Sequence, residues 1–129
     1  MKHPRWIDPR ALLLLHQESL AGHGGLPELR DENALESALA RPLNVNAYEP
    51  QADVARLATA YGFGIVRKHP FNDGNKRTGF LAIGLFLELN RFSLISDTVD
   101  AIETITRLAG GRLSEAALAK WIRERISRH

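Results

Sequence analysis

Two long apolar stretches flank one short polar segment in the middle of the chain. The stretch from Asp53 to Lys68 is mostly apolar and small, and the stretch from Thr78 to Asn90 places apolar residues on almost every side of a helical wheel. A helix that is hydrophobic on all of its faces is normally buried. The sequence therefore predicts two buried central helices, joined by a polar turn whose side chains sit on rigid supports.

The turn reads His-Pro-Phe-Asn-Asp-Gly-Asn-Lys-Arg-Thr from residue 69 to residue 78. The first helix must end at His69, because the proline that follows cannot continue the helical hydrogen-bond ladder, and the residue before a proline avoids the α region. Gly74 supplies a positive φ or lets a ligand approach the backbone closely. Asn75, Lys76 and Arg77 then fall in the first turn of the second helix, where unpaired N–H groups and the helix dipole favour an anion.

The side chains of this turn indicate a chemistry. Lys76 and Arg77 add positive charge at the helix start, and arginine grips phosphate oxygens with two parallel hydrogen bonds. A bare phosphate would repel Asp73, so a carboxylate beside that cradle implies a bridging cation, usually Mg²⁺. Histidine titrates near neutrality, which suits His69 to act as a general base toward a hydroxyl. The turn therefore predicts phosphate transfer from a nucleotide to a hydroxyl.

Each of these residues also has a purely structural interpretation. Asp73 could serve as a cap near the helix start, Lys76 and Arg77 could form a solvated first turn, and most histidines have no catalytic role. Phe71 is structural in either case, as an apolar plug that pins the turn to the core. The occurrence of so many specific polar groups between two buried helices favours the functional interpretation.

The turn resembles the motif of the Fic/Doc superfamily, and specifically that of its Doc (death-on-curing) branch, through His69, Phe71, Asp73, Gly74, Asn75, Lys76 and Arg77. Fic proteins of the adenylylating type carry a second glycine where this chain has Lys76 and a second arginine where it has Phe80, whereas Doc-type toxins carry the lysine. Leu15-His16 and residues 24–27 and 35–42 also look like the N-terminal half of Doc-like proteins, so the resemblance covers essentially the whole chain.

The resemblance implies a toxin of a type II toxin-antitoxin system. Doc proteins act as Mg²⁺-dependent kinases that transfer the γ-phosphate of ATP to a threonine of elongation factor Tu, which stops translation. Many Fic proteins carry an inhibitory Ser/Thr-x-x-x-Glu helix within the same chain. No glutamate of this sequence has Ser or Thr four positions before it. Inhibition should therefore come from a separate protein, and by resemblance this is a Phd-type antitoxin whose C-terminal segment folds as an amphipathic helix on the toxin.

The resemblance also implies roles for individual residues. His69, Asp73, Lys76 and Arg77 are expected to be catalytic, with Asp73 holding the metal. Gly74, Asn75, Lys76 and Arg77 are expected to bind the nucleotide phosphates. In the family, a flap beside the active site holds the target polypeptide, and the matching segment here comprises Asn44, Val45, Asn46, Ala47 and Tyr48. A plain connector is the alternative for that segment.

Two other functions compete with protein phosphorylation. Adenylyl transfer to a protein hydroxyl would use His69 and Asp73 in the same roles, but Phe80 stands where that class has its second arginine. A long cation at Lys76 would also block the nucleotide path that glycine leaves open, so that the γ-phosphate faces the base. A non-catalytic regulator that binds a nucleotide or nucleic acid is the other alternative. The formal net charge is only +2 with scattered basic residues, so we expect no direct contact with nucleic acid.

The chain of 129 residues predicts a single domain, residues 1–129, with its own core. The hydrophobic content of 44% and the charged content of 25% are ordinary for a globular protein. Without cysteine it has neither disulfides nor thiolate metal sites. We find no apolar run of signal-peptide or membrane-spanning length, which predicts a cytoplasmic protein that makes no membrane contact.

Local signals predict the other helices of an all-α bundle of about six helices with a short flap loop. One helix begins at Pro9 after the cap Asp8 and ends near Gly22, with Gly24-Gly25 forming a turn; His16 and His23, on or near it, receive no chemical role. A short helix follows Asp31 and ends before Pro42, and residues 43–50 form a loop or hairpin.

After a brief extended link at residues 91–95, Ser96 or Asp97 caps a helix. Its inner side is expected to carry Val99, Ile102, Ile105, Thr106 and Ala109. Ser114 caps the last helix, whose apolar spacing continues to Ile126.

Overall fold

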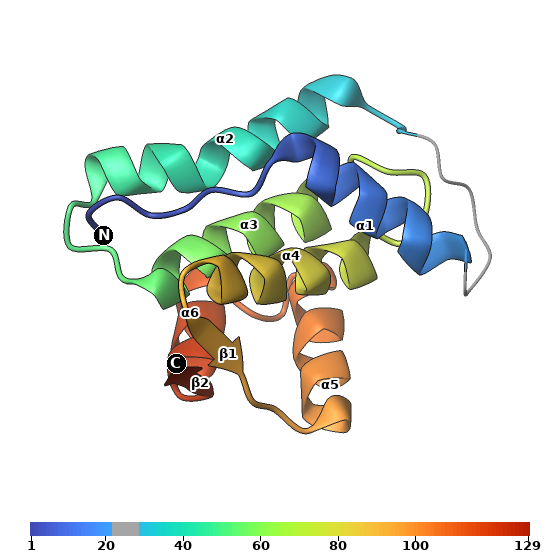
Figure 1. Cartoon of the computed structure of the whole chain (residues 1–129). Helices are drawn as coiled ribbons and strands as arrows, with labels where there is room; N and C mark the ends of the chain where they lie inside the picture. The colour runs from blue at the N-terminus through green and yellow to red at the C-terminus, as the bar shows by residue number, and fades with distance from the viewer. Residues whose placement is uncertain (22–28) are drawn as a thin grey trace.

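The computed structural model describes residues 1–21 and 29–129, and this part of the chain contains six helices and one two-stranded sheet (Figure 1). The helices are α1 (Pro9–Ala21), α2 (Glu32–Tyr48), α3 (Val54–Lys68), α4 (Asn75–Leu89), α5 (Thr98–Ala109) and α6 (Glu115–Arg123). The strands β1 (Phe92–Leu94) and β2 (Ile126–Arg128) pair antiparallel. The predicted all-α bundle is confirmed. His23 and the turn predicted at Gly24-Gly25 lie outside the described residues.

The predicted central pair is α3 and α4, which pack against each other through two glycines. A Cβ atom at Gly62 of α3 would lie 2.5 Å from Cδ1 of Ile83, and one at Gly79 of α4 would lie 2.5 Å from Cγ2 of Val66. A larger residue at either position would force Ile83 or Val66 out of its place between the helices, because such a separation is far inside van der Waals contact. This close crossing fixes where the start of α4 lies relative to the end of α3, and the polar turn connects these two ends.

The remaining elements cover the pair from two sides. In Figure 1, α1 and α2 lie above α3 and α4, and α5, α6 and the small sheet lie below them. The three largest fully buried side chains of the described residues, Tyr61, Phe71 and Phe86, come from the central pair and the turn. Within the described residues, no helix is both long and apolar enough to cross a membrane.

Side-chain caps mark the helix starts, and the predicted caps Asp8 and Ser114 are confirmed, as is Asp97 from the two alternatives Ser96 and Asp97. Asp31, Asp53 and Asp97 each accept a hydrogen bond from a backbone N–H in the first turn of α2, α3 and α5, and Ser114 does so for α6. At α1, Asp8 accepts from the Arg10 N–H. Each cap satisfies one of the donors that a helix start leaves unpaired.

The prediction that α2 ends before Pro42 is wrong. The flap loop predicted after it is therefore wrong as well, because most of that segment is helical. Asn44, Val45, Asn46, Ala47 and Tyr48 form the last turns of α2, and Pro42 lies inside the helix. Proline in a helix interior costs a hydrogen bond and about 3 kcal/mol. Burial offsets this cost, because Leu35, Ala38 and Pro42 recur at helical spacing on the face that packs on the core.

The five former flap residues also lie at the wrong end of the bundle for a flap. The chain continues from Tyr48 to Asp53, the cap at the start of α3, whereas the polar turn follows the end of that helix. A helix of 15 residues spans about 22 Å. Asn46 instead accepts a hydrogen bond from the amino group of Met1 at 3.2 Å.

Two predictions on the C-terminal part of the chain also fail. The last helix ends at Arg123, and Ile126 belongs to β2, which pairs with β1. The apolar spacing continues past the helix end because Ile126 still packs on the core from a strand. On α5, Val99 and Ile102 are exposed, and the buried side is formed by Ala101, Thr104, Ile105 and Leu108.

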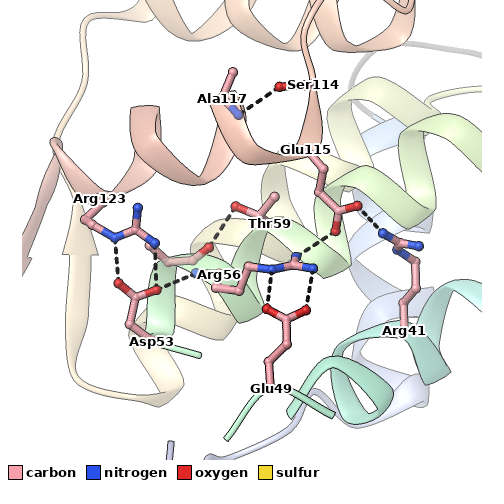
Figure 2. A network of polar contacts seen from close by, with 10 residues as sticks. Arg41, Glu49, Asp53, Arg56, Thr59, Ser114, Glu115, Ala117 and Arg123 are labelled. Atoms are coloured by element: carbon pink, nitrogen blue, oxygen red, sulfur yellow. Dashed lines mark hydrogen bonds and ion pairs between the residues drawn. The ribbon is translucent and has the colours of Figure 1, made fainter. Parts of the chain in front are cut away.

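A network of ion pairs joins the C-terminal end of α2 and the start of α3 to α6 (Figure 2). Arg56 bonds to Glu49 at 3.1 Å and to Glu115 at 2.7 Å, and Glu115 also pairs with Arg41. Arg123 binds the carboxylate of Asp53 through two nitrogens, at 2.6 and 3.0 Å. These ion pairs connect α2, α3 and α6 at the end of the bundle that lies away from the polar turn.

Replacing Asp53 with asparagine is expected to reduce stability in a pH-dependent way. The Arg123 guanidinium lowers the pKa of Asp53 below its ordinary value, so the pair stabilises the folded state above that value, and this contribution is lost as the pH falls through the folded pKa. Asparagine keeps the helix cap. In urea unfolding, the free energy of unfolding of wild type should exceed that of Asp53→Asn by about 0.5–1 kcal/mol at neutral pH. The two proteins should be equally stable at a pH below the folded pKa of Asp53. A difference that persists unchanged in acid would contradict this account.

Candidate active site

The polar turn lines one end of a cleft between α4, α5 and the segment that joins them. The cleft has a volume of about 920 Å³, which is within the range of small-molecule sites. Its polar end is formed by His69 and residues 72–77. Its other end is mainly apolar and is formed by Phe80, Leu81, Leu94, Ala101, Ile102 and Ile105, together with the hydroxyl residues Ser96, Thr98 and Thr106. One cleft thus offers charged groups at one end and an apolar wall at the other.

His69 ends α3, as the sequence predicts, but in a conformation that the sequence did not indicate. Its φ and ψ are 50° and 57°, which is the left-handed region, and its N–H bonds to the carbonyl of Ile65. Left-handed backbone is uncommon for a residue with a side chain. The residue is exposed and lines the cleft. An imidazole at this position is accessible to a hydroxyl that enters the cleft.

The start of α4 has the features of an anion site. Gly74, the N-cap residue of α4, has a φ of 75°, which confirms the predicted positive value, and it has no side chain that could cap the helix. A helix start leaves its first N–H groups without backbone partners inside the helix, and the helix dipole adds partial positive charge there. Lys76 and Arg77 are exposed and line the cleft beside this helix end. Arg77 also donates to the hydroxyl of Ser19 in α1 at 3.2 Å.

Asn75 has a different task from the one the sequence suggested for its side chain. Its Oδ1 accepts from the N–H of Phe71 at 3.0 Å, and its Nδ2 donates to the carbonyl of Phe71 at 2.9 Å. The side chain is buried, so both bonds satisfy backbone groups that would otherwise be unpaired. Its amide closes the turn, and its backbone N–H lies at the start of α4, where it can contact a phosphate.

His16, to which the sequence assigned no role, holds the turn from the α1 side. Its ring is 1% exposed and stacks on Phe71 with a centroid distance of 3.7 Å. Because a carbonyl oxygen only accepts, Nε2 of His16 donates to the carbonyl of Asp73, at 2.8 Å. The signal in the sequence is the spacing of Leu12, His16 and Leu20, which places His16 in the middle of the buried stripe of α1.

The structure therefore brings the motif residues together at one end of the cleft, with Asp73, Gly74, Lys76 and Arg77 around the start of α4 and His69 across the turn. Asn44 to Tyr48 do not line it. The segment that lies beside the turn is instead Leu29 to Asp31, which pairs with it through backbone contacts.

The residues present suit a magnesium ion that arrives with a nucleotide. Among the described residues, no three histidine or acidic side chains form a cluster that could hold a metal ion by themselves. Asp73 is one exposed carboxylate that lines the cleft beside the anion site. Mg²⁺ commonly uses one or two carboxylates and completes its shell with phosphate oxygens and water. Asp73 would hold such an ion.

Comparison with known proteins identifies relatives of the chain. A sequence model described as the Fic/DOC family matches residues 6–87. The chain is 31% identical over 119 residues to a protein named "Protein kinase doc" from Escherichia phage P1, an alignment that covers 92% of this chain and 94% of the phage protein. It is 37% identical over 87 residues to a protein named "Toxin Doc" from Mycolicibacterium smegmatis, covering 64% of this chain and 65% of that protein.

Proposed function

The chain belongs to the Fic/DOC family, and we propose that it is the toxin of a type II toxin-antitoxin system that transfers the γ-phosphate of ATP to a hydroxyl of a protein. One observation carries the proposal: His69 lines the same cleft as the start of α4, which follows the glycine N-cap Gly74 and carries Lys76 and Arg77. A general base and an anion site in one cleft are the parts that phosphoryl transfer needs, since this reaction depends on alignment and charge neutralisation. The name of the phage relative supports the kinase reading.

In the proposed mechanism, the N–H groups at the start of α4 and the side chains of Lys76 and Arg77 bind the phosphates and hold the γ-phosphate toward His69. The imidazole of His69 takes the proton of the incoming hydroxyl. The hydroxyl oxygen then bonds to the γ-phosphorus, the bond to the bridging oxygen breaks, and ADP leaves. Asp73 would hold Mg²⁺, which supplies neutralisation of phosphate charge.

We propose a threonine of elongation factor Tu as the acceptor, in the cytoplasm, which would explain toxicity through a block of translation. The polar end of the cleft is open, since His69, Asp73, Lys76 and Arg77 are all exposed. An exposed reaction centre accommodates a hydroxyl carried on a folded protein, which an enclosed site would exclude.

Replacing Lys76 with glycine is expected to reduce phosphorylation by about 10–100-fold and to permit some adenylyl transfer. The long cation at the first turn of α4 fills the path along which a nucleotide would run past the helix, and it supplies a phosphate contact. The products are separated by mass spectrometry of the acceptor protein, with Lys120→Gly, in the last turn of α6 and outside the cleft, as a control for the loss of one exposed lysine. Full kinase activity in Lys76→Gly would mean that another group sets the direction of the nucleotide.

The apolar end of the cleft is the part that we propose for a Phd-type antitoxin. Ile102 is 60% exposed and lines the cleft together with Leu81 and Leu94, and Val99, on the same helix, is 59% exposed. An amphipathic helix that lies on this wall would bury these side chains and would also block access to the polar end. Inhibition would then follow from occupation of one continuous cleft.

Replacing Ile102 with aspartate is expected to separate toxicity from neutralisation. A charge in the centre of an apolar interface should cost at least about 2 kcal/mol, or roughly 30-fold in Kd, whereas the polar end of the cleft is unchanged. The measurement is growth during co-expression with the neighbouring gene, together with the Kd of the purified pair. Leu43→Asp, which also replaces an exposed leucine but on α2, is the matched control. Equal rescue of the Ile102→Asp variant and wild type would place the antitoxin elsewhere.

A further inference from the structure

Residues 29–31, which precede α2, are hydrogen-bonded to the backbone of the polar turn. Leu29 and Phe71 form an isolated antiparallel bridge. The carbonyl of Pro70 accepts two hydrogen bonds, from the N–H of Arg30 at 2.8 Å and from that of Asp31 at 3.1 Å. Asp31 in turn caps α2. The segment at the start of α2 therefore holds the backbone of the turn at Pro70 and Phe71.

The side chain of Arg30 adds a second attachment. Its Nε donates to the carbonyl of His69 at 2.6 Å, and its Nη2 donates to the carbonyl of Lys68 at 2.9 Å. These are among the last carbonyls of α3, which lack partners within the helix and carry the negative end of the helix dipole. The planar guanidinium matches two adjacent acceptors, which the ammonium of a lysine does not.

His69 needs support from outside its own helix. A left-handed conformation is unfavourable for a residue with a side chain, and the φ of His69 is 50°. In the described part of the chain, the hydrogen bonds of His69 are made by its backbone, through its N–H to Ile65 and its carbonyl to Arg30. The backbone conformation sets the direction in which the side chain of His69 leaves the chain, and Arg30 holds that backbone at the carbonyl.

We propose that Arg30 is a positioning residue, outside the motif, that holds His69 in the left-handed conformation from which its imidazole faces the cleft. The inference rests on the proposed function in one respect, namely that His69 is the general base. Without the two hydrogen bonds of the Arg30 guanidinium, the end of α3 would relax toward conformations in which the imidazole of His69 is misplaced. A displacement of about 1 Å at a reacting group is enough to cost about 10²-fold in rate.

Three variants test the proposal by steady-state kinetics on the acceptor protein with ATP and Mg²⁺. Arg30→Gln should lower kcat by about 10–100-fold and leave the KM for ATP within about twofold, because the anion site at the start of α4 is untouched. Arg30→Lys restores one of the two bonds and should recover part of kcat. Arg107→Gln removes an exposed arginine from the last turn of another helix, α5, and should behave as wild type. A wild-type kcat in Arg30→Gln would overturn the proposal, as would equal losses in Arg107→Gln.

Hydrogen exchange followed by mass spectrometry tests the role of Arg30 without depending on phosphoryl transfer. The Arg30→Gln protein should exchange faster at residues 67–72 and at the same rate as wild type in α5 and α6. If the wild-type chain transfers no phosphate, the proposed function fails, and exchange alone then decides whether Arg30 holds the turn. Unchanged exchange at residues 67–72 would overturn the proposal whatever the activity of the wild type.

Discussion

Replacing His69 with alanine is expected to lower phosphoryl transfer by about 10²–10⁴-fold while the protein remains folded. The loss follows from the imidazole being the group in the cleft proposed to take the hydroxyl proton. The fold should survive, because His69 is exposed and alanine leaves its backbone bonds to Ile65 and Arg30 in place. The rate is measured by transfer of labelled γ-phosphate to the acceptor protein, and folding is measured by thermal unfolding.

The chain offers a matched control for this variant. His3 is also exposed and also has a left-handed backbone, with a φ of 55°, but it lies in the N-terminal segment away from the cleft. His3→Ala should therefore match wild type in both rate and stability. Wild-type turnover in His69→Ala would remove His69 from the chemistry, and a rate loss in His3→Ala of the same size would point to an effect on folding.

Replacing Phe71 with alanine is expected to cost about 3–5 kcal/mol of unfolding free energy. Its ring is 1% exposed and stacks on His16, and no small rearrangement fills the space that it leaves. This is a large share of the roughly 5–15 kcal/mol that stabilises a typical domain. Activity should fall as well, because His16 loses the ring that holds it beneath the carbonyl of Asp73.

Urea unfolding of Phe71→Ala and Phe71→Leu tests this expectation. Leucine keeps much of the apolar volume but not the stacking on His16, so Phe71→Leu should lie between wild type and Phe71→Ala in stability. The backbone bonds of residue 71 to Asn75 are available in both variants. A loss below about 1 kcal/mol in Phe71→Ala would show that the ring is not the anchor of the turn.

The parts of the fold that could be predicted are those with local causes. Asp31, Asp53, Asp97 and Ser114 cap helices through bonds to their own neighbours, so the sequence places those helix starts correctly. Pro42 misled the prediction, because its local cost is visible in the sequence and the burial that offsets it is not. The end of α6 and the strand at Ile126 depend on pairing with β1, which lies far away along the chain.

The candidate site divides in the same way. The motif residues are contiguous, so one helix end and one turn bring them to the cleft, and the sequence identified them as a set. His16 and Arg30 come from other segments and act on the backbone of the turn, so their roles appear only when the segments are packed together. The flap prediction was wrong because Asn44 to Tyr48 were assigned from their position along the chain. In the folded protein they lie near the start of α3, whereas the polar turn follows its end.

The central claim, phosphorylation of a protein by His69 and the start of α4, is tested most directly by mass spectrometry of elongation factor Tu. The factor is incubated with the chain, ATP and Mg²⁺, with parallel samples that contain His69→Ala or a chelator. We predict the added mass of one phosphate on a threonine with wild-type protein and no addition in either parallel sample. The added mass of AMP would indicate adenylyl transfer, and an unmodified factor in the presence of wild-type protein would contradict the proposed reaction on this target.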